Sequence, residues 1–309
     1  MTSAQPTSPR RVALLTHVGR PEAITAARQI AGDLAAAGFV PVIPEADLLR
    51  MDGALAELAV EPLPADANSL AGCELAIVLG GDGTILRAAE LTLASDTPLL
   101  GVNLGHVGFL AEAESSEIGA ISEAVIAGSW RVEERFVIDV RVSDCEGLQT
   151  WSSFAINEVS IEKEARERVL EVLASIDERP ISRWACDGVL VATPTGSTAY
   201  AFSAGGPVVW PEVDALLMVP LSAHALFSRP LVLGPSSHVQ IELLPTPVAH
   251  QGVVWCDGRR STTLAVGSRV RVQKSDRRLR LARLSSAPFT DRLVHKFGLQ
   301  VDGFRGGRA

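Results

Sequence analysis

The chain has 309 residues, of which 47% are hydrophobic and 21% are charged, and its formal net charge is -8. This composition argues against extensive disorder, and the length suits two domains. The 28 Lys and Arg residues are dispersed, which argues against a nucleic acid or an anionic membrane as the main partner. Four widely spaced cysteines without a CxxC pair indicate reduced residues in a cytoplasmic protein.

The first part of the chain alternates predicted strands with predicted helices. An apolar run at 11–18 predicts a strand, and Pro21 suits the first position of a helix that ends near Gly38. The further elements predicted here are a strand at 39–44, a helix near 53–60, a strand at 74–79, a helix at 84–93 and a strand at 98–104. This alternation predicts an α/β domain with a mainly parallel sheet over residues 11–145, after a disordered tail at 1–10.

The pattern changes after about residue 130 to alternation of polar and apolar residues with a period of two. Such alternation predicts strands of an antiparallel, β-rich second domain over residues 146–284. The segments that show it are 132–143, 150–161, 168–177, 238–244, 268–274 and 278–284. The Asp257-Gly258 pair, which Arg259 and Arg260 follow, predicts a hairpin turn. In the remaining segment, 285–309, Phe289, Leu293 and Phe297 share one helical face, so this segment is expected to dock on the protein.

The most informative short motif is GGDGT, which follows the predicted strand at 74–79 and comprises Gly80, Gly81, Asp82, Gly83 and Thr84. Three glycines so close together lose entropy on folding, which indicates that the backbone conformation they permit is needed. Backbone N–H groups beside a helix N-terminus would form an anion site. The chain has no Walker A pattern, and no GxGxxG follows a strand. In the alternative, Asp82 only caps the helix and the glycines only form a turn.

Two later segments also contain polar groups in apolar surroundings. Asn157 and Glu158 are consecutive in a predicted strand, so at least one faces the interior or a cleft, and together they could bind a vicinal diol such as a ribose. A strand-end Asn beside a solvated Glu is the alternative. The segment 184–208 is rich in Gly, Thr and Ser and contains Tyr200, the only tyrosine. This ring could stack on a base or an amide ring, or it could be a half-buried packing residue.

In this order, GGDGT, NLGHVGFL, NE and DGVLVATPTGSTAY resemble the motifs of NAD kinases, in particular the actinobacterial type, and the resemblance extends from about Arg11 to about Gly306. It implies transfer of the γ-phosphoryl of ATP, or of polyphosphate, to the adenosine ribose 2′-hydroxyl of NAD, which gives NADP. It also implies Mg²⁺ bound with ATP, a homodimer or homotetramer formed through a dinucleotide-binding second domain, and a C-terminal segment that packs on the first domain.

The resemblance also implies roles for individual residues. Asp82 would accept the proton of the 2′-hydroxyl, and it could also orient that hydroxyl or hold the magnesium; no further protein metal site is expected. The phosphate-donor loop would be formed by Gly80, Gly81, Gly83 and Thr84. The NAD-binding residues would be Asp82, Gly83, Arg87, Phe109, Leu110, Asn157, Glu158, Arg168, Asp187, Thr195, Thr198, Ala199, Tyr200 and Ser203.

Within this set, Asn157 and Glu158 would hold ribose hydroxyls, and Asp187 would contact the nicotinamide end. Phe109 and Leu110 would shape the adenine pocket. Arg87 and Arg168 are candidates for phosphate charge, although an Arg considered alone is more often a solvated surface residue than a ligand. The dinucleotide channel would be lined by Thr195, Thr198, Ala199, Tyr200 and Ser203.

One position departs from the family pattern: many NAD kinases have a basic residue two positions before the Asp187-Gly188 pair, where this chain has Ala185. The pyrophosphate charge would then be neutralised by Arg183, by Arg168 or by a neighbouring subunit. Two other functions stay open at this point. One is a kinase of the same superfamily with a different acceptor, and the other is an NAD(P)-binding sensor without catalytic activity.

Overall fold

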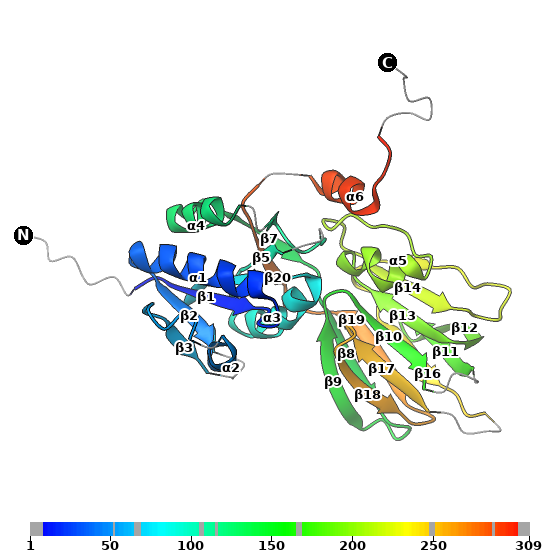
Figure 1. Cartoon of the computed structure of the whole chain (residues 1–309). Helices are drawn as coiled ribbons and strands as arrows, with labels where there is room; N and C mark the ends of the chain where they lie inside the picture. Colours follow the sequence, from blue (N-terminus) through cyan, green and yellow to red (C-terminus); the bar gives the residue numbers. More distant parts are fainter. Residues whose placement is uncertain are drawn as a thin grey trace, which may run out of the picture. The chain divides into compact units, whose positions relative to one another are not determined.

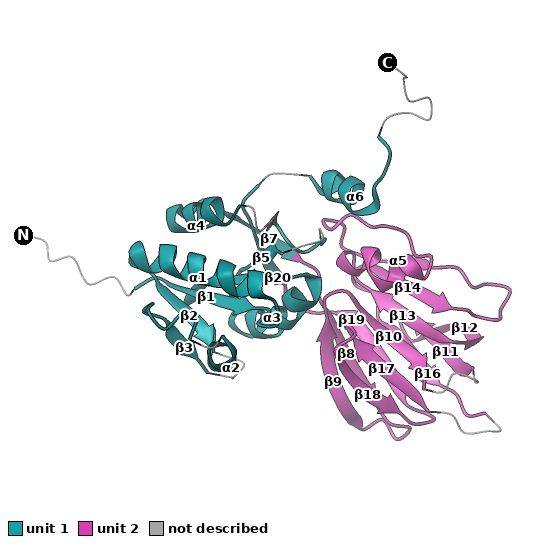
Figure 2. Ribbon diagram, viewed as in Figure 1, with its two compact units in different colours: residues 1–134, 279–309 teal, residues 135–278 magenta. Residues whose placement is uncertain are grey.

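The computed structural model describes residues 9–51, 53–64, 69–104, 108–114, 117–164, 169–246, 251–285 and 288–301. The chain divides into two compact units (Figure 2). The first comprises Met1–Glu134 together with Leu279–Ala309, and the second comprises Arg135–Arg278. These boundaries differ from the predicted ones at 145/146 and 284/285, and the strand pairing explains the difference.

In its described residues, the first unit contains an eight-stranded sheet in the order β3-β2-β1-β4-β5-β20-β7, with β6 paired to β5 (Figure 1). The parallel pairs are β1–β2, β1–β4, β2–β3, β4–β5, β5–β6 and β5–β20. The strands are β1 (Arg11–Thr16), β2 (Val40–Pro44), β3 (Glu61–Leu63), β4 (Cys73–Leu79), β5 (Leu99–Asn103), β6 (Ala113–Glu114), β7 (Arg131–Arg135) and β20 (Leu279–Arg283).

Helices cover both faces of this sheet. On one face, Leu14, Ile77 and Val102 form one buried cluster with Ile30 of α1 and Ile121 of α4. On the other face lies α3, because the Ile85 side chain of α3 reaches the face of β5 on which Gly101 lacks a side chain. The helices are α1 (Pro21–Ala36), α2 (Glu45–Arg50), α3 (Asp82–Ser95), α4 (Ile118–Ala127) and α6 (Phe289–Phe297).

Three sequence predictions for this unit are wrong. The helix expected near 53–60 is absent, and α2 lies earlier, because Gly53 has a φ of 74° that an α-helix does not accommodate. Arg10, which was expected in a disordered tail, is bonded to Glu74 and lies over the ring of Phe39. The strand at 278–284 was expected in the second domain. It is β20, which pairs parallel with β5 in the first unit.

The second unit contains two six-stranded antiparallel sheets in its described residues. Their orders are β15-β14-β13-β10-β17-β18 and β12-β11-β16-β19-β8-β9. The strands are β8 (Ile138–Ser143), β9 (Gln149–Ala155), β10 (Glu158–Lys163), β11 (Leu170–Ile176), β12 (Arg179–Cys186), β13 (Gly188–Ala192), β14 (Leu216–Leu221), β15 (Leu231–Leu233), β16 (Val239–Leu243), β17 (Gly252–Cys256), β18 (Arg260–Leu264) and β19 (Arg269–Lys274). Because β8 pairs with β19 and β9, this unit begins before residue 138.

Each face of the first of these sheets is covered by a different set of side chains. Between the two sheets lies a buried core that includes Trp184, Val159 and Val191. On the opposite face, Leu190 and other buried residues of β13 and β14 pack against Ala201. That residue belongs to α5 (Tyr200–Ser203), which follows a short 3-10 helix, η2 (Thr195–Thr198). The TGSTAY segment therefore lies on this face, beside β13.

The predicted fold class is confirmed: a mainly parallel α/β part is followed by an antiparallel, β-rich part. In the part of the chain that the structure describes, no helix combines the length and the apolar character that crossing a membrane requires.

Candidate active site

Asp82 is the first residue of α3, and its carboxylate bonds to the second glycine-rich loop. Oδ2 accepts the backbone N–H of Phe109, and Oδ1 accepts the N–H of Leu110, both at 3.3 Å. A Cβ atom on Gly108 would lie 2.2 Å from Oδ1 of Asp82, so a side chain at 108 would displace this carboxylate. Asp82 is thus held by the neighbouring loop, and a role limited to capping α3 does not account for its contacts.

The glycines of GGDGT do not have left-handed backbone conformations, since the φ angles of Gly80, Gly81 and Gly83 are not positive. The expectation that an unusual conformation requires them is therefore wrong. A Cβ on Gly80 would lie 2.5 Å from Oγ1 of Thr84, whereas a Cβ on Gly81 or Gly83 would meet nothing within 4 Å. Gly80 permits close packing. Gly81 and Gly83 leave the backbone at the N-terminus of α3 open to an anionic ligand.

The C-terminal helix packs against the loop that holds Asp82. The ring centroid of Phe109 lies 5.8 Å from that of Phe289 and 5.7 Å from that of Phe297. Leu110 is buried. The expected docking of the C-terminal segment is confirmed within the first unit, and one side of the Phe109 ring is occupied by α6.

Two of the candidate arginines, Arg87 and Arg183, form ion pairs with carboxylates. Arg87 forms an ion pair with Asp47 at 3.4 Å. Burial raises the pKa of the Asp47 carboxyl, and the positive charge of Arg87 opposes that increase. Arg183 pairs with Glu171. Arg168 lies outside the described residues.

Asn157 and Glu158 lie where β10 begins, and the backbone around them is bonded on both sides. The N–H of Asn157 donates to Asp257 Oδ1 at 2.7 Å, and the carbonyl of Asn157 accepts the N–H of Thr193 at 2.8 Å. The Glu158 side chain is buried and accepts the backbone N–H of Tyr200. The expectation that one member of the pair faces the interior is confirmed, and that member is Glu158.

Burial and the nearby Asp257 carboxylate raise the pKa of Glu158 from its usual 4.5 to about 8. Oε2 of Glu158 has no hydrogen-bond partner among the described residues. The same holds for Oγ1 of Thr195, which is also buried. Buried polar atoms without a partner are rare in native proteins, and a bound ligand is one explanation for them.

Replacing Glu158 by Gln is expected to remove a pH dependence of stability. Because the pKa in the folded chain lies above 4.5, the proton on Glu158 stabilises the fold fully below pH 4.5, and this contribution is lost as the pH rises through 8. Between pH 6 and pH 9 the free energy of unfolding should therefore fall by about 3 kcal/mol more in the unmodified protein than in Glu158→Gln. Urea titrations of both proteins at the two pH values would measure this difference. Equal falls would contradict the prediction.

The NE and TGSTAY motifs lie in direct contact. A Cβ on Gly196 would lie 2.0 Å from the carbonyl oxygen of Asn157. In the sheet, Glu158 of β10 is opposite Ala192 of β13, the strand that leads into η2. The structure therefore brings together two motifs that are separated by more than thirty residues in the sequence.

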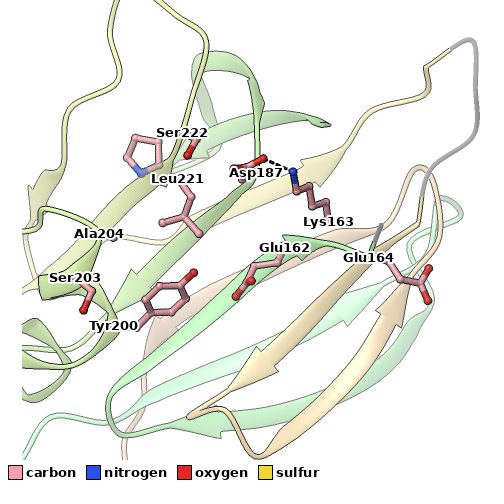
Figure 3. A pocket seen from close by; sticks show the side chains of 10 residues that line it. Glu162, Lys163, Glu164, Asp187, Tyr200, Ser203, Ala204, Leu221 and Ser222 are labelled. Atoms are coloured by element: carbon pink, nitrogen blue, oxygen red, sulfur yellow. Dashed lines mark ion pairs between the residues drawn. The ribbon is translucent and has the colours of Figure 1, made fainter. Parts of the chain in front are cut away.

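A cavity of about 570 Å³ lies beside these motifs (Figure 3). Asp187, Tyr200 and Ser203, three of the predicted NAD-binding residues, line it. The Nζ atom of Lys163 is 2.5 Å from Oδ1 of Asp187, and this contact lowers the pKa of the Asp187 carboxyl. Figure 3 marks the ion pair of Asp187 and Lys163 with a dashed line and shows the Tyr200 ring, which lines the same cavity.

Lys163 was not among the residues predicted for the site, and Asp257 was predicted only as part of a hairpin turn. Lys163 could have been found from strand register, because an antiparallel pairing of 158–162 with 188–192 places it beside Asp187. It supplies a cation beside Asp187, two residues after Ala185, the position at which the family resemblance implies a basic residue. For Asp257, the only signal in the sequence was the Asp-Gly pair, which indicates a turn but not the contacts of the carboxylate.

Among the described residues, no group of three or more His, Cys, Asp and Glu side chains could hold a metal ion. The four cysteines are unpaired with one another, and only Cys145 is exposed. The polar groups that the motifs supply are the carboxylate of Asp82 in the first unit and the buried polar atoms of Glu158 and Thr195 in the second.

Comparison with known proteins agrees with this arrangement. The ATP-NAD kinase N-terminal domain matches residues 12–130, and the ATP-NAD kinase C-terminal domain matches residues 156–284. The chain is 50% identical to an NAD kinase of Cutibacterium acnes over 98% of its own length and 94% of that protein. It is 49% identical to an NAD kinase of Mycobacterium tuberculosis over 97% of its own length and 99% of that protein.

Solved structures show the same fold. A yeast NADH kinase complexed with NADH superimposes with a TM-score of 0.85 at 22% identity, over 98% of this chain and 91% of that one. An NAD kinase from Archaeoglobus fulgidus in complex with ATP gives a TM-score of 0.61 at 24% identity, over 93% of this chain and 97% of that one. Since two family domains and full-length relatives at about 50% identity match, this chain belongs to the ATP-NAD kinase family.

Proposed function

We propose that Asp82 is the residue that receives the proton when this NAD kinase phosphorylates its acceptor. In this reaction the adenosine ribose 2′-oxygen of NAD forms a bond to the γ-phosphorus of ATP, and the bond between that phosphorus and the β,γ-bridging oxygen breaks. The hydroxyl proton passes to the Asp82 carboxylate, and the products are NADP and ADP. Because phosphoryl transfer has a loose transition state, most of the contribution of Asp82 comes from orienting the hydroxyl.

The contacts of Asp82 support this role. Two backbone N–H groups, those of Phe109 and Leu110, hold its carboxylate in place. The open backbone of Gly81 and Gly83 and the N-terminus of α3 would receive the phosphates of ATP.

Mg²⁺ fits this site as an ion bound mainly by the nucleotide. Mg²⁺ commonly uses one or two carboxylates together with substrate phosphates and water, and GGDGT offers the single carboxylate of Asp82. When bound with ATP, the ion would neutralise phosphate charge. The homodimer or homotetramer that the family resemblance implies stays a prediction.

We further propose that the second unit binds NAD through the pair Asn157 and Glu158. The observation that supports this proposal most directly is the buried Oε2 of Glu158, which has no partner among the described residues. A ribose hydroxyl could bond to it. The adjacent cavity would receive the rest of the dinucleotide, with Asp187 and Lys163 at the nicotinamide end and Tyr200 against a ring.

The remaining predicted contacts keep their proposed roles. Thr195, Thr198, Ala199 and Ser203 would line the dinucleotide channel. Phe109 and Leu110 would shape the adenine pocket, Thr84 would complete the donor loop, and Arg87 and Arg168 would meet phosphate charge.

Replacing Asn157 by Ala tests the NAD-binding role. The variant should raise the KM for NAD at least about tenfold, because it removes hydrogen bonds to the ribose, while the KM for ATP changes less than about threefold. Initial rates of NADP formation, followed with an NADP-specific dehydrogenase, give both constants. Gln149→Ala, at an exposed position of β9 in the same unit, is the control. An unchanged KM for NAD in Asn157→Ala would remove the proposal.

A further inference from the structure

Asp257 forms the turn between β17 and β18, and it does more than turn the chain. Asp257 and Gly258 have φ angles of 52° and 63°, and the N–H of Arg259 donates to the carbonyl of Cys256 at 3.0 Å, so a turn with two left-handed residues closes this hairpin. The predicted hairpin is therefore confirmed. Asn and Asp both suit the first position of such a turn, so the turn alone does not require a carboxylate.

The Asp257 carboxylate is buried, with only 1% of its side chain exposed. It points at the backbone that begins β10: Oδ1 accepts the N–H of Ile156 at 3.0 Å and the N–H of Asn157 at 2.7 Å. In addition, the backbone N–H of Asp257 donates to the carbonyl of Glu158 at 2.9 Å. One residue of the turn thus bonds three consecutive residues that lie about 100 positions earlier in the chain.

Arg260 holds this carboxylate from the other side. Its Nη2 donates to Oδ2 of Asp257 at 2.8 Å and to the carbonyl of Phe154 at 3.0 Å. The guanidinium also stacks over the Phe154 ring, 3.9 Å from the centroid. Burial raises the pKa of the Asp257 carboxyl, and the N–H groups of Asn157 and Ile156 and the charge of Arg260 oppose that rise. A buried carboxylate without such a cation would be costly.

We propose that Asp257 is a positioning residue for NAD, because its carboxylate fixes the backbone from which the side chains of Asn157 and Glu158 project. On the opposite side, the Asn157 carbonyl accepts the N–H of Thr193 and is in contact with Gly196. Asp257 on one side, and Thr193 and Gly196 on the other, therefore hold the Asn157 backbone in place. This inference rests on the proposed role of Asn157 and Glu158 in binding NAD.

Asp257→Asn is the variant that tests this inference. Asn keeps the turn and the size of the side chain, but it brings an amide N–H₂ group toward two N–H donors and loses the charge that Arg260 pairs. We expect the KM for NAD to rise at least about tenfold, with kcat and the KM for ATP changed less than about threefold. The constants come from initial rates at saturating concentrations of the other substrate, with the folded fraction checked by circular dichroism.

Asp177→Asn is a matched control. Asp177 also begins a turn with positive φ, here 50° followed by 64° at Glu178, and its Oδ1 accepts the backbone N–H of His238 at 2.8 Å. It therefore has the same kind of turn and the same kind of contact, without any bond to Asn157. All three kinetic constants should be unchanged in this variant.

Arg260→Lys extends the test in case Asp257→Asn does not fold. Lys keeps the positive charge but cannot bond both Asp257 and the Phe154 carbonyl in the same planar geometry, so a smaller rise in the KM for NAD, about threefold or more, is expected. A normal KM for NAD in folded Asp257→Asn or in Arg260→Lys overturns the inference. If Asn157→Ala raises that KM while Asp257→Asn does not, only the positioning role fails. If neither raises it, the proposed NAD site itself is wrong.

Discussion

Replacing Asp82 by Asn is expected to lower kcat at least about a hundredfold, while the KM and the dissociation constant for NAD change less than about threefold. The amide has nearly the same shape as the carboxylate, but it accepts no proton at neutral pH. One of its two terminal groups also becomes a donor that faces the N–H of Phe109 or of Leu110, whereas both carboxylate oxygens accept in the unmodified chain. Orientation and proton acceptance are therefore lost together.

Turnover is measured as NADP formed from NAD, ATP and Mg²⁺, and NAD affinity by calorimetry without ATP. Asp96→Asn serves as the control, because Asp96 lies at the other end of the same helix, is exposed and has a left-handed φ of 54° that Asn tolerates. Full turnover in Asp82→Asn would show that the carboxylate has no part in the transfer. Loss of NAD binding with normal kcat would place Asp82 in binding alone.

The sequence predicted secondary structure well where that structure depends on the backbone preferences of single residues. Pro21 fixed the start of α1, and the Asp-Gly pair at 257 and 258 identified a hairpin, since both depend on backbone preferences of single residues. The helix expected near 53–60 is absent. Leu55 and Leu58 share helical spacing, but Gly53 has a left-handed φ that an α-helix does not accommodate.

Sheet membership was harder to predict than strand position. The alternation in β20 showed which side chains share a face, but it contains no information on the partner strand. Pairing with β5 moves β20 into the first unit, where Arg283 is buried with Glu112. The first domain boundary differs from the predicted one at 145/146 because β8 pairs with β19, which lies about 130 residues further along the chain.

The site shows a similar division. Motifs with unusual composition, GGDGT and TPTGSTAY, were found as candidates, because glycine and hydroxyl residues stand out from strand and helix patterns. Lys163 and the carboxylate contacts of Asp257 were not, because their roles depend on residues that register and turns bring close together. Arg87 looked like a phosphate ligand from its spacing to the loop, but only the fold shows its partner Asp47.

Replacing Gly196 by Ala is expected to lower the stability of the protein and to weaken its binding of NAD. The new Cβ would lie 2.0 Å from the carbonyl oxygen and 2.4 Å from the carbonyl carbon of Asn157. These are backbone atoms of the residue just before β10, so relief requires η2 to separate from that segment, which breaks the bond from Thr193 N–H to that carbonyl. We expect a loss of about 3 kcal/mol or more in the free energy of unfolding. In the protein that remains folded, the KM for NAD should rise at least about tenfold.

Urea unfolding and initial rates measure the two effects of Gly196→Ala separately. Gly234→Ala is the control in the same unit, because a Cβ there would meet nothing within 4 Å and its φ is not positive. It should change the free energy of unfolding by less than about 1 kcal/mol. If Gly196→Ala were as stable and as active as Gly234→Ala, the close contact between the TGSTAY and NE motifs would not exist in the protein. The arrangement of Asn157 and Glu158 proposed above would then lose one of its two supports, and Asp257 alone would have to hold that backbone in place.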